Sequence, residues 1–221
     1  MKKITITQIS EKKIKAGNPL LQMEDFPNEL SFDEGELVEL VDSRQKFVAK
    51  AYLAKQNKGV GWVFSLDNAD SFNEAFFKKQ FEKAKRKRTD LQSDPETTTY
   101  RLFNAEGDGI PGVTIDHYDG FAVVSWYSEG IFRYQTAIIA AFQAVFPETK
   151  GIYEKFRYQR KDGLISRYVR GDAAPTPLIV KENGINYATY LDDGLMTGIF
   201  LDQRDVRGAL TERYAAGKRV L

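Results

Sequence analysis

The stretch Gly107–Gly112 spells G-x-G-x-x-G, a pattern typical of loops that bind dinucleotides. Such a loop must open a helix, because the free amides of the first helical turn face the phosphates. Here Pro111 and Gly112 lead into the β-branched run Val113–Ile115, which is typical of a strand. The pattern therefore predicts a tight turn that enters a hairpin, and not a nucleotide site.

His117 is the only histidine, and the chain contains no cysteine. Thiolate chemistry, disulfides and zinc–thiolate sites are therefore excluded, and Ser–His catalysis would have to pass through His117. His117 lies in a predicted hairpin strand without a nucleophile signature. The neighbouring Asp116 and Asp119 could suggest a metal, but Asp119 already serves the turn, and Asp192–Asp193 further along also favours a turn. We expect a structural histidine, no catalytic residue in this stretch and no metal. A small-molecule enzyme that uses His117 stays open as the weakest alternative.

The charges are segregated along the chain, although the formal net charge is only +1. Residues 25–43 carry acids only, whereas residues 78–88 and 150–170 are rich in lysine and arginine. Aromatic residues alternate with cations around Tyr153–Tyr168, which predicts apolar side chains facing inward and a basic outer face with Lys155 on it. Such a face fits a polyanion such as RNA, and it fits an ordinary solvated sheet equally well. Trp62 could stack on a base or belong to the core.

The elements expected along the chain form two compact units. Strands are predicted at 36–41, 46–53 and 60–64, followed by a helix whose capping box is Ser71 with Glu74. Two-residue hairpin turns are predicted at three dipeptides, which are Asp119–Gly120, Asp162–Gly163 and Asn183–Gly184. Helices are expected at 131–146 and at 202–216, the latter ending at Gly217.

The composition is that of a soluble globular protein, with 42% hydrophobic and 29% charged residues. There is no run of about 18 apolar residues and no signal-peptide pattern at the start. We therefore expect a cytoplasmic protein.

Two stretches resemble a known family. Thr197–Arg204 with Arg207 and Lys218–Leu221 is similar to K-T-G-x-x-L-D-Q-R-x-x-R followed by R-V-L, and Arg101–Asp116 is similar to R-L-x-x-x-E-x-D-G-x-P-G-x-x-x-D. Both patterns are typical of the RlmI-type 23S ribosomal RNA (cytosine-C5) methyltransferases, which use S-adenosylmethionine. Met196 replaces the usual lysine before Thr197.

The resemblance implies an α+β fold: a small PUA-like β-barrel, then a hairpin-rich α+β domain, ending at the first strand of a Rossmann-like methyltransferase domain that would lie beyond Leu221. The expected divisions are a PUA-like RNA-binding domain at 1–68 and a connecting helix and linker at 69–96. A central α+β domain follows at 97–191, and the entry segment of the methyltransferase domain at 192–221. It also implies that the intact protein binds S-adenosylmethionine and methylates a ribosomal RNA base, while this portion alone is inactive. A stand-alone PUA-like RNA-binding or assembly module is the alternative, and a homodimer is left open.

The candidate site residues follow from that resemblance and from the charges. Gln203, Arg204 and Arg207 are expected to border the cofactor or the target base. Nine cations are expected to contact RNA phosphates, six of them in the first unit and three in the second: Lys12, Lys13, Lys15, Lys50, Lys55, Lys58, Arg157, Arg160 and Arg167.

Overall fold

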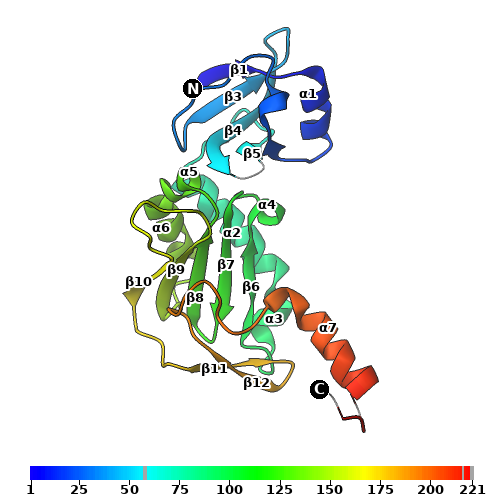
Figure 1. Cartoon of the computed structure of the whole chain (residues 1–221), viewed down its shortest axis with the longest axis vertical. Coiled ribbons are helices and arrows are strands. Elements are labelled where there is room, and N and C mark those ends of the chain that lie inside the picture. Colours follow the sequence, from blue (N-terminus) through cyan, green and yellow to red (C-terminus); the bar gives the residue numbers. More distant parts are fainter. Residues whose placement is uncertain (57–58, 216, 220–221) are drawn as a thin grey trace.

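The chain folds into two sheet-based bodies stacked end to end (Figure 1). The structure is a computed structural model that describes residues 1–56, 59–215 and 217–219. The mixed α+β class expected from the sequence is confirmed.

The first body is a five-stranded sheet in the order β1-β3-β4-β5-β2. Its strands are β1 (Lys2–Thr5), β2 (Leu20–Leu21), β3 (Leu37–Val41), β4 (Phe47–Gln56) and β5 (Gly59–Ser65). Between β1 and β2 lies α1 (Gln8–Lys15), which the sequence analysis missed, and a 3-10 turn η1 (Met23–Asp25) follows β2. Thr7 caps α1 because its side chain accepts a hydrogen bond from the Ser10 amide at 3.2 Å.

The second body is a five-stranded sheet in the order β10-β9-β8-β7-β6. Its strands are β6 (Thr99–Asn104), β7 (Val113–Tyr118), β8 (Phe121–Trp126), β9 (Gly151–Phe156) and β10 (Ser166–Gly171). Its helices are α2 (Glu74–Lys87), α3 (Thr89–Ser93), α4 (Ala105–Asp108), α5 (Glu129–Phe132) and α6 (Gln135–Val145). α2 and α6 pack against each other and share one buried cluster with a face of this sheet.

The opposite face of the second sheet is also covered. The hairpin β11 (Leu178–Glu182) and β12 (Ile185–Thr189) buries Leu178 and Val180 against Val123 and Tyr153. Both faces of β9 are therefore packed, and all six of its residues are buried. The chain continues through η2 (Leu201–Gln203), α7 (Arg204–Ala209) and the π-helical turn η3 (Leu210–Ala215).

One of the buried hydrophobic clusters spans both bodies. Tyr52 and Trp62 of the first sheet belong to the same buried cluster as Phe72 and Trp126. Tyr52 donates a hydrogen bond from its hydroxyl to the Pro111 carbonyl at 3.0 Å. The junction is therefore a packed interface and not a linker.

Several predicted elements are confirmed. The strands at 36–41, 46–53 and 60–64 correspond to β3, β4 and β5. Asp119–Gly120 and Asn183–Gly184 form tight turns in which all four residues have positive φ. The Gly107–Gly112 stretch leads into β7 and opens no helix after it, as expected.

Other predictions were wrong in detail. The cap of α2 is Asn73, whose side chain accepts from the Phe76 amide, and not Ser71. A nine-residue connection replaces the two-residue turn at Asp162–Gly163, because the pairing of β9 with β10 begins only at Ser166. The helix expected at 131–146 is interrupted between α5 and α6. Lys218 and Arg219 are not in a strand, and Val220 and Leu221 lie outside the described residues.

Candidate functional site

Two adjoining cavities lie where the two bodies meet, and together we call them the junction cleft. The larger cavity has a volume of about 960 Å³ and the smaller one about 560 Å³. Gln56, at the end of β4, and Tyr127, just after β8, line both of them. The Gln56 side chain donates a hydrogen bond from Nε2 to the Tyr127 carbonyl at 3.3 Å, so this pair joins the bodies at the boundary between the cavities.

The larger cavity receives one predicted cation from each body. Lys55 lies near the end of β4, with an exposed side chain and a backbone amide that donates to Glu34 Oε1 at 2.9 Å. Arg157 follows β9 directly and is exposed, and its Nη2 donates to the Leu195 carbonyl at 2.9 Å. Both cations therefore stand at strand ends that the packing of two sheets brings to one cleft.

Arg160 and Arg167 lie against the aromatic wall behind this cavity. Their guanidinium carbons are 4.3 and 5.7 Å from the centre of the Phe156 ring, which lines the cavity. Arg167 Nε donates to Glu154 Oε2 at 2.7 Å, and Glu154 is completely buried. Arg160 forms an ion pair with Asp162, and its hydrogen bond lowers the pKa of Asp162 to about 2. These two arginines are therefore largely committed to partners within the chain.

The three predicted cations of α1 are not in the cleft. Lys12, Lys13 and Lys15 lie on α1 and line neither cavity. Lys13 pairs with Asp25 at 3.0 Å and Lys15 with Glu11 at 2.6 Å. Lys58 lies outside the described residues.

Lys50 is a correction, since RNA cannot reach its ammonium in this structure. The residue is 7% exposed, and its Nζ donates to the carbonyls of Asn68 and Asp70 at 2.6 and 2.8 Å. The segment after β5 folds over Lys50 and satisfies its charge with backbone oxygens.

Lys155 is a second correction, because it does not lie on a basic outer face. It is completely buried on β9, where Nζ donates to the Gly194 carbonyl at 2.7 Å. Burial, assisted by repulsion from Arg157, lowers the pKa of Lys155 to about 8. The predicted alternation assumed one solvated face, whereas the β11–β12 hairpin and the segment after it cover that face.

The three residues expected beside the cofactor or target base lie on the C-terminal segment, outside the junction cleft. Arg207 makes a bidentate pair with the buried Glu182, at 2.7 and 2.8 Å, and donates to the Phe200 carbonyl. Arg204 lines a small cavity of about 170 Å³ with Tyr100. Gln203 is exposed. The structure therefore gives Arg207 a clear role in anchoring α7 to the β11–β12 hairpin.

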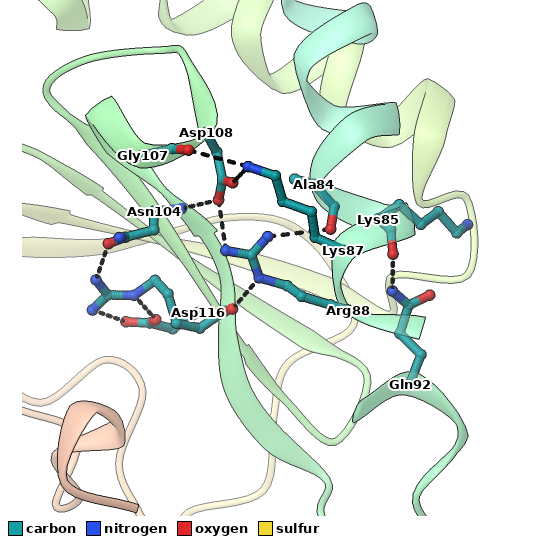
Figure 2. Close-up of polar contacts among 10 residues, drawn as sticks. Ala84, Lys85, Lys87, Arg88, Gln92, Asn104, Gly107, Asp108 and Asp116 are labelled. Carbon is teal, nitrogen blue, oxygen red and sulfur yellow. Dashed lines mark hydrogen bonds and ion pairs between the residues drawn. The ribbon is translucent and has the colours of Figure 1, made fainter. Parts of the chain in front are cut away.

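The polar wall of the smaller cavity is held by a buried carboxylate (Figure 2). Asp108, on α4, accepts hydrogen bonds from Arg88 at 2.6 Å, from Lys87 at 2.9 Å and from the Asn104 amide at 2.8 Å. Burial alone raises the pKa of Asp108, but these hydrogen bonds outweigh it and lower the pKa overall. The end of α2 is thereby fixed to the end of β6 and to α4, which carry Asn104 and Glu106.

His117 is structural, as expected. Its Nε2 accepts a hydrogen bond from the Gly120 amide at 3.2 Å, and its ring stacks on Tyr100 with centroids 5.0 Å apart. Burial lowers the pKa of His117 to about 4, so the ring is neutral at pH 7. Over residues 1–56, 59–215 and 217–219, no group of three or more acidic or histidine side chains is arranged to hold a metal ion. Within the same residues, no helix has the length and apolar character needed to span a membrane.

Sequence reasoning missed most of the cleft. Gln56, Asn104 and Tyr127 are polar residues at strand ends, and nothing in their local sequence marks them. The one available signal was the resemblance over Arg101–Asp116, which contains Asn104 and Glu106 but was used only to assign the family.

Comparisons with known proteins agree with the resemblance. Residues 4–66 match a family model described as a PUA-like domain. The chain is 42% identical over 225 residues to YwbD of Bacillus subtilis, a candidate ribosomal RNA large subunit methyltransferase; the match covers all of this chain and 57% of YwbD. It is 35% identical over 191 residues to ribosomal RNA large subunit methyltransferase I of Cronobacter sakazakii, covering 85% of this chain and 48% of that protein.

Comparison with solved structures also finds methyltransferases. A candidate SAM-dependent methyltransferase from Streptococcus mutans matches with a TM-score of 0.91 and 44% identity, over 99% of this chain and 56% of that one. A candidate methyltransferase in complex with SAH matches with a TM-score of 0.92 and 44% identity, over 99% and 55%. The chain spans about half the length of the relatives it matches. These matches confirm the predicted relationship: along its whole length, this chain is related to the RlmI-type family of large-subunit ribosomal RNA methyltransferases.

Proposed function

We propose that this chain binds ribosomal RNA for an S-adenosylmethionine-dependent methyltransferase, and that the junction cleft receives the RNA backbone. The observation that carries the proposal is the convergence of Lys55 and Arg157, from two different sheets, on one cavity of about 960 Å³. Phosphate contacts from such cations supply affinity and fix register, whereas base contacts supply specificity. The names of the relatives support ribosomal RNA as the substrate and S-adenosylmethionine as the methyl donor.

The glycine-rich stretch Gly107–Gly112 does not fit S-adenosylmethionine. A nucleotide-type loop follows a strand and opens a helix, whereas this stretch begins inside α4 and leads into β7. The role we assign to this chain is therefore to hold RNA, and methyl transfer belongs to the intact methyltransferase. A stand-alone RNA-binding module would use the same cleft, but the relatives' names favour the enzyme.

The test is fluorescence anisotropy of the chain with a labelled 23S ribosomal RNA fragment, titrated with salt. Each phosphate contact to a single strand contributes about 0.7 to the slope of log K against log salt. The double variant Lys55→Gln/Arg157→Gln should therefore reduce the slope by about 1.4. A matched control, Lys78→Gln/Arg213→Gln, removes two exposed charges outside the cleft and should leave the slope unchanged. Absence of binding at low salt, or equal slopes for both double variants, would refute the proposal.

A further inference from the structure

The smaller cavity of the junction cleft combines an apolar wall with a polar one. The apolar wall consists of Pro19, Leu20 and Trp62 from the first body. The polar wall consists of Arg101, Asn104, Glu106 and Thr114 from the second. A volume of about 560 Å³ lies within the range of small-ligand pockets.

The apolar wall is rigid. Leu20 of β2 pairs with Trp62 of β5, and the Val63 amide donates to the Pro19 carbonyl at 2.8 Å. The Trp62 ring stacks on Tyr52 with centroids 5.5 Å apart and an interplanar angle of 23°. This wall therefore does not have to order itself when a flat ring packs against it.

The polar wall has hydrogen-bonding capacity that the chain does not use. Arg101 forms an ion pair with Asp116 and donates to Asn104 Oδ1 at 3.3 Å, which fixes the Asn104 side chain. Glu106 is exposed, and among the described residues its carboxylate accepts one long hydrogen bond, from the Gly112 amide to Oε1 at 3.3 Å. Thr114 is 4% exposed, and its Oγ1 has no hydrogen-bond partner among the described residues. The exposed Glu106 carboxylate is therefore the acceptor that this wall offers to a ligand, whereas Thr114 Oγ1 is covered by the protein.

We propose that the smaller cavity binds one unstacked nucleobase that carries an exocyclic amino group. The base packs against the Leu20–Trp62 wall, and its amino group donates to the Glu106 carboxylate. Unpaired bases are commonly recognised in this way, with apolar packing on the ring and hydrogen bonds to its edge. Adenine, guanine and cytosine have the amino donor, whereas uracil does not. This inference rests on the proposed function, because the base in the smaller cavity belongs to the RNA strand whose backbone lies in the larger cavity.

The two tryptophans of the chain provide a direct test. Trp126 is completely buried, whereas Trp62 is 4% exposed and lines the cavity, so base binding should quench Trp62 selectively. The chain is titrated with oligocytidylate, with oligouridylate of equal length and with free CMP. Because a hydrogen bond to a charged group is worth about tenfold in affinity, oligocytidylate should bind about ten times more tightly than oligouridylate. Trp62→Phe should abolish the quenching.

The discriminating variant is Glu106→Ala, with Glu82→Ala, an exposed acid of α2, as its control. Glu106→Ala should bring the ratio of the two affinities close to one, and Glu82→Ala should preserve it. Equal affinities in the unmodified chain, or a preference that survives Glu106→Ala, would overturn the inference. If the 23S fragment still binds in that case, the proposed function stands and only the base pocket is wrong. If CMP binds as tightly as oligocytidylate, the ligand is a free nucleotide and the assignment to an RNA base is wrong.

Discussion

Gly130 is the position at which the packing of the two bodies can be tested most sharply. It lies in α5, which packs on β4 of the first body. A Cβ atom at Gly130 would lie 2.4 Å from Ala54 Cβ, 2.9 Å from the Gly35 amide nitrogen and 3.0 Å from the Leu53 carbonyl oxygen. Two of these three are backbone atoms, so the bodies themselves would have to separate.

We expect Gly130→Ala to lower the free energy of unfolding by about 1–3 kcal/mol, the usual cost of overpacking. Gly208→Ala is the matched control, because Gly208 is helical and its nearest recorded neighbour, Asn183 Nδ2, is 3.4 Å away. Replacing a helical glycine by alanine should raise the stability by up to about 1 kcal/mol. The same Gly→Ala change is therefore expected to lower the free energy of unfolding at position 130 and to raise it at position 208.

The assay is urea unfolding followed by both tryptophan fluorescence and circular dichroism. Because one buried cluster contains residues of both bodies, both probes should report the same unfolding transition in the unmodified chain. Gly130→Ala should shift the midpoint to lower urea and weaken RNA binding, since the larger cavity needs both bodies in place. An unchanged midpoint, or two separate transitions in the unmodified chain, would refute the idea of a rigid junction.

Three further predictions concern single polar residues. Asp108→Asn should cost about 3 kcal/mol in urea unfolding, because it leaves a largely buried guanidinium without its carboxylate, whereas the exposed Asp90→Asn should cost nothing measurable. Arg207→Gln leaves Glu182 buried and unpaired, so amide hydrogen exchange should become faster in α7; exchange unchanged from the parent chain would contradict an anchoring role. Because the pKa of His117 is lowered to about 4, the unfolded chain takes up a proton at this residue before the folded chain does, and the stability should fall as the pH decreases from about 6.5 to about 4. This loss of stability should be smaller in His117→Gln, and equal pH profiles of the two chains would contradict the prediction.

Local chemistry made the elements of the fold predictable. Alternating apolar residues defined β3 to β5, and dipeptides that tolerate positive φ defined the turns at Asp119–Gly120 and Asn183–Gly184. The missed helix α1 is short, and only two of its eight residues are buried, so its apolar periodicity is weak. The cap of α2 was misplaced by two residues, because Ser71 and Asn73 are both good capping residues and only packing decides between them.

The functional site was much less predictable, as the lysines of β4 illustrate. Lys50 and Lys55 look equivalent in the sequence, yet the chain after β5 folds over Lys50 and leaves Lys55 exposed at the cleft. Whether a charge is solvated depends on a distant segment, and no local pattern reports it. Lys155 fails for the same reason, since the β11–β12 hairpin and its following segment cover the face expected to be open.

The proposed RNA site does not require a high total charge, and the net charge of this chain is only +1. Affinity for phosphates depends on where the cations lie and on how much conformational freedom they lose on binding, and not only on the total charge. Arg157 is already held by its hydrogen bond to the Leu195 carbonyl. Lys55 lies on β4 next to Gln56, whose side chain is hydrogen-bonded to the Tyr127 carbonyl. The shared core fixes the separation of the two bodies, so little further ordering is needed when a strand enters. Binding should therefore respond more strongly to changes in the junction than to the loss of any one exposed charge elsewhere on the surface.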